Sequence, residues 1–194
     1  MIIDFKEIPK AHLGGGQQDT FELFARDFLQ ELGFEIIRHP DRGPDGKKDM
    51  IVQELRNGVG GTTTIKWLVS CKHFAHSHKS SAVKDTDEPN IMERLSANDC
   101  KGFIGIYSTI ASSSLSNLLY AIKDKFEHQI FDHKRIEKHI LENKQRHLLF
   151  KRYFTNSYEK HKHLIKESKT SDNSRILKGN PINFSEEDIL RICK

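Results

Sequence analysis

One segment near the middle of the chain constrains the fold more than any other. Residues 101–109 read KGFIGIYST, a run that is apolar at consecutive positions. Side chains alternate between the two faces of a strand, so a continuous apolar run indicates that both faces are covered. The segment therefore predicts a strand buried on both sides within a sheet.

Helical and extended patterns alternate around this strand. Apolar residues recur at helical spacing over 19–32 and 112–124, and Gly33 ends the first helix as a C′ residue. Shorter helices are predicted at 91–98 and 136–142, and the further strands are expected at 34–37, 49–52, 65–72 and 129–131. The glycine-rich stretch 58–64 suits a hairpin-like loop. We expect an α/β fold with an α-β-β-β-α-β core, in which helices flank a central mixed β-sheet.

The length of the chain fits one such domain with a small appendage. It has 194 residues, enough for a single hydrophobic core. We expect a flexible N-terminal segment over 1–17, the core over 18–145 and a basic, polar C-terminal extension over 146–194.

The charge of the chain is unevenly distributed. The formal net charge is only +4, but residues 121–170 hold 13 Lys and Arg against 7 Asp and Glu, which leaves 18 against 20 elsewhere. A basic segment beside a faintly acidic body fits a phosphate-rich partner, and it fits a solvated helix face as well.

Composition excludes other classes. No apolar run approaches the ~18 residues of a membrane helix, so we expect no membrane association, and the opening MIIDFKEIPK lacks the features of a secretory signal. The 3 cysteines are too few and too scattered for a disulfide framework, which favours a cytoplasmic protein.

Two carboxylates and a lysine are expected to meet at one edge of the sheet. Glu22 lies on the first helix, on a side shared with Ala25 and Leu29 that leans toward the sheet. Asp49 begins the second strand and Lys72 ends the third, so pairing across the 58–64 loop brings these two together. Ser70 and Lys72 share one face of their strand, and Cys71 lies on the other.

This pattern resembles the PD-(D/E)XK nuclease superfamily and, within it, the Mrr-like restriction endonucleases. The resemblance runs from Gln18 to about Leu119, through DTFELFARDFLQELGF, GPDGKKDMIV, WLVSCKHF and KGFIGIYST. It implies a restriction-endonuclease-like fold with Asp49, Lys72 and the helix residue Glu22 in the active site. The sequence departs from the family at Ser70, where an acidic residue or Gln is usual.

The resemblance also implies the chemistry. Mg²⁺, with Mn²⁺ as a substitute, prefers oxygen ligands and activates water for phosphodiester hydrolysis. Asp49 would be the main ligand, Glu22 a second or outer ligand, and the backbone carbonyl of Cys71 a third. Lys72 would orient the attacking water and stabilise charge on the phosphate. Ser70 can at best hydrogen-bond to water on the metal, and Asp45 is a further contributor.

Plainer interpretations stand beside these. Asp19 and Glu22 fit a helix capping box, Asp49 fits an ordinary turn acid, and Lys72 fits a lysine that reaches solvent. Three histidines in HFAHSH (73–78) lack a fourth zinc ligand at a recognisable spacing. The stretch FKRYFTNSYEKHKH (150–163) fits both a nucleic-acid contact and a helix packed by its aromatic residues. The expected nucleic-acid contacts are Lys47, Lys48, His73, Lys151, Arg152, Lys160 and Lys162.

Taken together, these features predict a Mg²⁺-dependent DNA endonuclease. The resemblance implies a role in restriction or anti-phage defence in a prokaryote, as a homodimer or with a partner subunit. The alternatives are a nuclease-fold module that binds nucleic acid without cutting it, with Ser70 as the trace of a lost site, and an interaction subunit of a defence complex.

Overall fold

The structure, a computed structural model, describes residues 1–10, 19–39, 50–77 and 81–176, with side chains up to residue 167. The chain divides into two compact units, residues 1–158 and 159–194. The first unit holds all elements up to the first turn of the last helix, and the described part of the second continues that helix.

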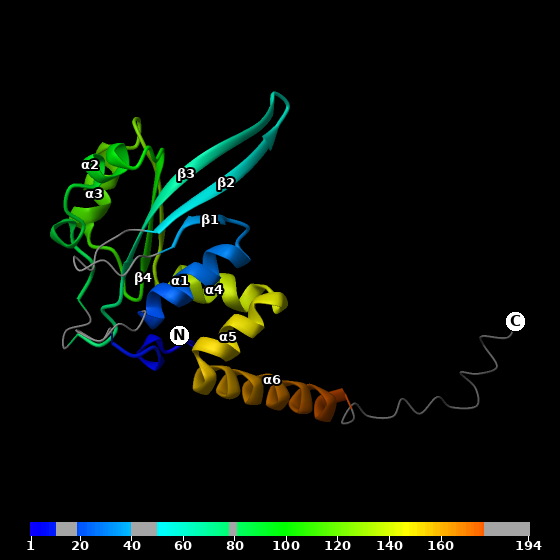
Figure 1. The fold of residues 1–194 in the computed structure, drawn as a ribbon. Helices are drawn as coiled ribbons and strands as arrows, with labels where there is room; N and C mark the ends of the chain where they lie inside the picture. Colours follow the sequence, from blue (N-terminus) through cyan, green and yellow to red (C-terminus); the bar gives the residue numbers. More distant parts are fainter. Residues whose placement is uncertain (11–18, 40–49, 78–80, 177–194) are drawn as a thin grey trace, which may run out of the picture. The chain divides into compact units, whose positions relative to one another are not determined.

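Helices and strands alternate in the expected order (Figure 1). The strands are β1 (Glu35–Arg38), β2 (Met50–Gly58), β3 (Gly61–Lys72), β4 (Gly102–Tyr107) and β5 (Glu127–Phe131). The α-helices are α1 (Thr20–Glu31), α2 (Ile91–Ala97), α3 (Ser113–Ala121), α4 (His133–Glu142), α5 (His147–Tyr153) and α6 (Thr155–Ile176). Short 3₁₀ turns are η1 (Phe5–Glu7), η2 (Asp85–Asp87) and η3 (Lys144–Arg146).

The strands form one mixed sheet in the order β1-β2-β3-β4-β5. β1, β2 and β3 are antiparallel neighbours, whereas β3, β4 and β5 run parallel. Every residue of β4 is buried, as its continuous apolar sequence predicts. The α/β fold with a central mixed sheet flanked by helices is confirmed.

The connection between β2 and β3 differs from the expected loop over 58–64. Gly58 pairs with Gly61, so the turn consists of Val59 and Gly60 and the strands continue on either side of it. Thr62, Thr63 and Thr64 are β-branched residues that favour strands, and the surrounding glycines conceal this preference in the sequence. We call residues 55–64 the arm, because among the described residues they pair only with one another and project beyond the rest of the sheet (Figure 1).

One face of the sheet is covered by α1, α4 and α5. The apolar side of α1 supplies Phe24 and Phe28, which pack against Val52 and Trp67 of the sheet in the first core. Gly33 has φ +96, the left-handed conformation expected for a helix C′ residue. The remaining buried residues of the first core are Ile3, Phe5, Ile8, Phe21, Ala25, Leu29, Met50, Val69, Ala75, Ile104, Ile106, Phe131, Ile136, Ile140, Leu149, Phe150 and Phe154.

The opposite face is covered by α2 and α3. Leu95 of α2 and Leu115 of α3 pack with Leu68 and Phe103 of the sheet in this second core. Ser112 caps α3 by accepting a hydrogen bond from the backbone N–H of Leu115. Both faces of the sheet are therefore sealed by apolar side chains.

The start of the chain departs from the flexible segment expected over 1–17. Ile3, Phe5 and Ile8 are buried in the first core. Glu137 of α4 accepts hydrogen bonds from the N–H groups of Ile2 and Ile3, at 2.6 and 2.7 Å. Glu7 accepts from the first turn of α6, including the N–H of Ser157 at 2.8 Å. Three isolated apolar residues carry no periodicity, so the sequence offered no sign of this packing; residues 11–17 lie outside the described part.

The core also extends beyond residue 145, where a polar extension was expected to begin. Phe150 and Phe154 are fully buried, and Phe154 lies edge-on to Phe5 with ring centroids 5.1 Å apart. Tyr153 and Tyr158 pack against the same core. The aromatic residues of this stretch therefore pack internally, as one of its two sequence interpretations proposed.

Candidate active site

The candidate site lies at the end of the β2–β3 ladder opposite the arm. Met50, the first described residue of β2, pairs with Val69 of β3. β3 then continues through Ser70 to Lys72, which pairs with Tyr107 of β4. Asp49, Lys47, Lys48 and Asp45 precede Met50 and lie outside the described residues.

The backbone of β3 presents a carbonyl at this edge. The carbonyls of Lys66 and Lys72 accept hydrogen bonds from the β4 side, from the N–H groups of Lys101 and Ser108. Because backbone groups alternate along a strand, the carbonyl of Cys71 points to the opposite side, the side of β2. Cys71 lies two residues past Val69, the partner of Met50, and the residues that precede Met50 lie outside the described part of the chain. Its orientation fits the metal-ligand role expected for Cys71.

Ser70 and Lys72 face the second core by the same alternation, since Leu68 belongs to the second core and Cys71 packs against the first. Ser70 is 4 % exposed, whereas Lys72 is half-buried at the end of the strand. Within the described part of the chain, the Lys72 ammonium has no hydrogen-bond or ion-pair partner. A lysine with an uncommitted charge at a strand end is available to an anionic substrate.

Glu22 lies near the same end of the sheet. Asp19 caps α1 by accepting a hydrogen bond from the N–H of Phe21 at 2.8 Å. The ring of Phe21 stacks on that of His73, directly after Lys72, with centroids 4.7 Å apart. Since α1 packs on the first core and Lys72 faces the second, the half-buried Glu22 and Lys72 approach this end from opposite faces. The side-chain groups of Glu22 and Lys72 can therefore meet only at the edge of the sheet.

His73 is a packed residue in the structure. Besides its stack on Phe21, its Nε2 lies 2.9 Å from the carbonyl oxygen of Ile8, which also lies 2.7 Å from Nε2 of His76. Burial lowers the pKa of His73, an effect that the hydrogen bond to Ile8 partly offsets. His73 therefore helps to hold the N-terminal segment beside the site, and its nucleic-acid contact stays a prediction.

The second core contains a buried carboxylate that the sequence patterns did not indicate. Glu88 is fully buried, accepts a hydrogen bond from the Tyr107 hydroxyl at 3.1 Å and pairs with Arg94 at 3.0 Å. Burial and the Glu88 carboxylate raise the pKa of Tyr107 well above its ordinary value. The triad ties the segment before α2 to Tyr107, the partner of Lys72. Glu88 lies in the polar stretch 73–90, where no periodicity distinguishes a buried acid from an exposed one.

A cavity of about 250 Å³ adjoins this end of the sheet. Its lining includes Lys6, Ser108, Thr109 and His133. The backbone N–H of Ser108, a lining residue, bonds to the carbonyl of Lys72 at 3.1 Å, so the cavity adjoins the backbone at the end of β3. Nδ1 of His133 is buried there without a hydrogen-bond partner in the described part of the chain. The cavity provides space and polar groups beside the candidate site.

The donors at this edge are those of a hard divalent cation. The groups expected as ligands, namely the Cys71 carbonyl, the Glu22 carboxylate and the Ser70 hydroxyl, are oxygen groups, the class that Mg²⁺ and Mn²⁺ prefer. Among the described residues, no three His, Cys, Asp or Glu side chains cluster as metal ligands. Asp49 lies outside that search, so the expected metal site depends on it together with the edge described above.

The predicted basic contacts on α5 and α6 are exposed residues. Lys151 and Arg152 lie on the surface of α5, and Arg152 pairs with Asp27 of α1 at 3.0 Å. Lys160 and Lys162 are exposed on α6 in the second unit, where Lys162 lies 3.7 Å from Glu159. Their contact with nucleic acid stays a prediction.

Comparison with known proteins agrees with the sequence resemblance. Residues 16–89 match the Mrr_cat family model, described as a restriction endonuclease, which covers less than half of the chain. This segment contains the whole β2–β3 ladder and both strand ends of the candidate site. The chain is thus restriction-endonuclease-like in fold, and its resemblance to the Mrr-like restriction endonucleases is confirmed over this segment.

Two solved structures are similar in fold. The DNA modification-dependent restriction endonuclease AspBHI has a TM-score of 0.49 and 12% identity, over 77% of this chain and 35% of that one. The MspJI restriction endonuclease, solved in complex with a 27-mer oligonucleotide, has a TM-score of 0.40 and 20% identity, over 62% of this chain and 27% of that one. The chain therefore spans about a third of the length of these proteins. No curated protein matches, and none of the described helices is long and apolar enough to cross a membrane.

Proposed function

We propose that this chain is a metal-dependent endonuclease that hydrolyses phosphodiester bonds of DNA. The pairing of Met50 with Val69 carries the proposal, because Asp49 is bonded to Met50 and Ser70-Cys71-Lys72 follows Val69. The expected acid thus comes directly before Met50, and the expected lysine lies three residues past Val69, the partner of Met50. The Mrr_cat match over 16–89 supports the same assignment.

Each group has a role that follows from its chemistry. Asp49, Glu22 and the Cys71 carbonyl would hold Mg²⁺, with Mn²⁺ as a substitute. The cation supplies charge neutralisation at the phosphate and lowers the pKa of water. The Lys72 ammonium orients the attacking water and stabilises the negative charge that develops on the phosphate. Ser70 donates a hydrogen bond to water in this site.

The biological setting belongs to the same proposal. A nuclease of this family would serve in restriction or anti-phage defence in the cytoplasm of a prokaryote. Cutting both strands needs two sites, so a homodimer or a partner subunit fits the activity. The remaining basic residues, Lys47, Lys48, Lys151, Arg152, Lys160 and Lys162 together with His73, would contact DNA.

A non-catalytic DNA-binding module is the competing function. Ser70 favours it, because a buried hydroxyl replaces the acidic or Gln residue that the family carries at this strand position. Such a module would bind DNA with an affinity that falls steeply with salt, without cutting it.

Plasmid cleavage separates the two functions. Supercoiled DNA is incubated with the wild-type chain in Mg²⁺, Mn²⁺ or EDTA, beside Asp49→Ala and Lys72→Ala. We expect metal-dependent nicking that falls by about 10³-fold or more in both variants, since each removes a group that acts in the transition state. Lys101→Ala, at the other end of β4, is the matched control and should retain full activity. An inert wild type that still binds DNA would support the competing module.

A further inference from the structure

The arm has two chemically different faces. Leu55 pairs with Thr64 and Asn57 with Thr62, so these four side chains share one face, which we call the Thr64 face. All four are exposed, and Leu55 is 58 % exposed. Arg56 pairs with Thr63 on the opposite face, the Thr63 face, which continues into Glu54 and Trp67.

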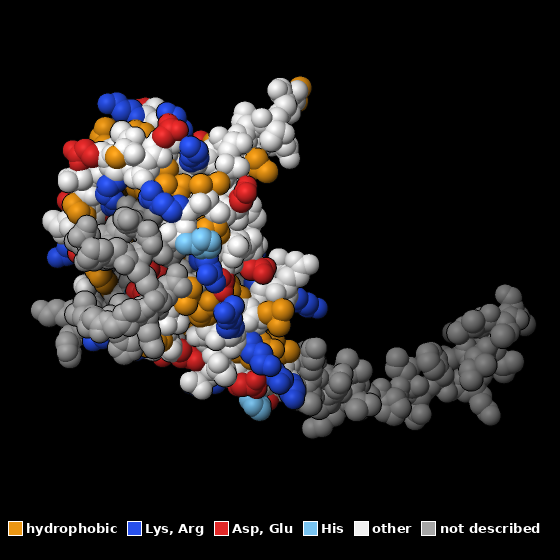
Figure 2. All heavy atoms as spheres, viewed as in Figure 1, with side chains coloured by type: hydrophobic (Ala, Val, Ile, Leu, Met, Phe, Trp, Pro, Cys, Tyr) orange, Lys and Arg blue, Asp and Glu red, His pale blue; other side chains and the backbone are white. Residues whose placement is uncertain are grey.

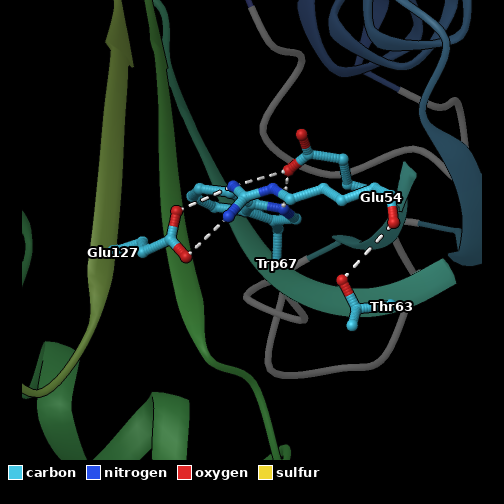
Figure 3. Close-up of polar contacts among 5 residues, drawn as sticks. Glu54, Thr63, Trp67 and Glu127 are labelled. Atoms are coloured by element: carbon cyan, nitrogen blue, oxygen red, sulfur yellow. Dashed lines mark hydrogen bonds and ion pairs between the residues drawn. The ribbon is translucent and has the colours of Figure 1, made fainter. Parts of the chain in front are cut away.

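The Thr63 face is occupied by contacts that anchor the arm. Arg56 forms hydrogen bonds to both oxygens of Glu127 at 2.9 and 2.7 Å and lies 3.0 Å from Glu54 (Figure 3). Its guanidinium lies over the ring of Trp67, 5.8 Å from the centroid, and the indole N–H donates to Glu54 at 3.0 Å. These contacts reach from the base of the arm to β5 at the far side of the sheet. These contacts hold the arm in place from its Thr63 face.

The Thr64 face carries neutral hydrogen-bonding groups without acidic side chains. From Gln53 to Lys66 this face presents, in pairs, Gln53 and Lys66, Leu55 and Thr64, Asn57 and Thr62. The acids Glu54 and Glu127 lie on the other face, where Arg56 forms an ion pair with each. Figure 2 shows the arm as a projection with few charged side chains. At the base of this face, Asp99 pairs with Lys66 at 3.4 Å and Glu35 accepts a hydrogen bond from Gln53 at 3.2 Å. Along residues 55–64 the face carries no acidic side chain, so a polyanion meets no acidic repulsion from the arm itself.

The dimensions and chemistry of the ribbon suit a DNA groove. Two strands lie about 4.8 Å apart, and the major groove, about 12 Å wide, admits a two-stranded ribbon. Asn and Thr side chains hydrogen-bond to base edges, and an apolar side chain such as Leu55 contacts the thymine methyl group. The same face is poorly suited to binding a protein, because Leu55 is the one large apolar side chain that the arm presents there.

We propose that the Thr64 face of the arm lies in the major groove of the DNA substrate and contacts base edges there, a role that rests on the proposed nuclease function. Asn57 lies seven residues along β2 from Met50, about 24 Å at the usual rise of a strand. At about 3.4 Å per base pair, the contact falls roughly seven base pairs from the cleaved bond. The arm then selects the sequence beside the cut, while the other end of the same ladder performs the chemistry.

The test compares adjacent threonines on opposite faces. The double variant Thr62→Val/Thr64→Val removes two hydroxyls from the Thr64 face and keeps the β-branched shape, and Thr63→Val is the matched control. Wild-type chain first selects from 30-bp duplexes of random sequence, in Ca²⁺ to limit cleavage. We expect the double variant to bind the selected duplex about tenfold more weakly, with lost enrichment near seven base pairs from the cut and an unchanged salt dependence. Thr63→Val should stay within twofold of wild type.

Each other outcome overturns the inference. Equal affinities and equal enrichment in all three proteins, with plasmid cleavage intact, would reject the arm contact and leave the nuclease function standing. A wild type that neither binds nor cuts DNA would reject both. Loss of a dimer in the double variant, seen by sedimentation without loss of sequence selection, would assign the arm to a second copy of the chain. Asn57→Ala, a second variant on the Thr64 face, should repeat the loss seen in the double variant.

Discussion

The two ends of the β2–β3 ladder differ in the contacts that fix them in the fold. At the Met50–Val69 end, helices cover both faces of the sheet, and β3 is paired onward to β4. At the arm end, residues 55–64 pair only with each other within the described chain, and contacts from Arg56 secure the base. Catalysis needs groups fixed to within fractions of an ångström, whereas groove recognition needs a projecting surface. One hairpin thus provides both a rigid and a projecting end.

The largest effect is expected where the ladder meets β4. A side chain on Gly102 would place its Cβ 2.2 Å from the Trp67 ring, which has no room to move within the first core. We expect Gly102→Val to destabilise the fold by about 3 kcal/mol, a fall in Tm of roughly 6–12 °C in a thermal melt. Gly60→Ala, at the tip where nothing lies within 4 Å, should change Tm by about 2 °C or less. Equal shifts would contradict the difference between the two ends.

Glu88 tests the packing on the other face of the sheet. Glu88→Gln keeps the shape but removes the charge that pairs with Arg94 and accepts the Tyr107 hydroxyl. Because Glu88 is fully buried and Arg94 is partly exposed, we expect a loss of about 2 kcal/mol in urea unfolding. The exposed Glu93→Gln on α2 serves as the control. A neutral Glu88→Gln would show that the triad does not stabilise this end.

Arg56 tests how the arm is anchored. Its carboxylate partners are partly exposed, so we expect Arg56→Met to cost only about 1 kcal/mol of global stability. The effect should be local instead: hydrogen exchange should accelerate at residues 55–64 and stay unchanged at β4. In the wild type, the hydrogen bonds from Arg56 lower the pKa of Glu127, so acid conditions should loosen the arm in the same way. Unchanged exchange in the arm would reject the anchoring role.

The smallest effect is the pH dependence from His73. Burial lowers its pKa below the ordinary value of 6.5, so the unfolded chain takes up the proton first as pH falls. The stabilisation is therefore complete above pH 6.5 and is lost as pH falls from 6.5 toward the lower folded value. His73→Phe, which keeps the stack on Phe21, should flatten the fall in Tm between pH 7 and pH 5. The same slope in both proteins would contradict this; His139, whose burial also lowers its pKa, should leave a residual slope.

The sequence predicts the core of the fold well, because its signals are local. The apolar run of β4 and the periodic apolar faces of α1 and α3 all appear where expected. Long-range packing leaves no such signal, which is why the burial of Phe5 was missed. Residues 62–64 were predicted as a loop because of the glycines around them, although they form a strand. Glycine disfavours strands, whereas threonine favours them.

The candidate site was predictable in kind and less so in arrangement. Motif spacing led to the β3 end with Lys72, and the register brings Met50 beside that strand end. Strand alternation also identified the shared face of Ser70 and Lys72. The sequence could not reveal that α1 and Lys72 lie toward opposite faces, because helix placement depends on the whole first core. The anchoring of His73 by Ile8 depends on a contact across 65 positions of the chain.

In the proposed nuclease, the β2–β3 end opposite the arm binds a divalent cation through Asp49. Titration of Mn²⁺, followed by electron paramagnetic resonance, tests this without any need for cleavage. We expect saturable binding to the wild type, at least tenfold weaker binding to Asp49→Asn, and unchanged binding to Glu54→Gln at the arm end. Equal Mn²⁺ affinity in the wild type and Asp49→Asn would contradict the account.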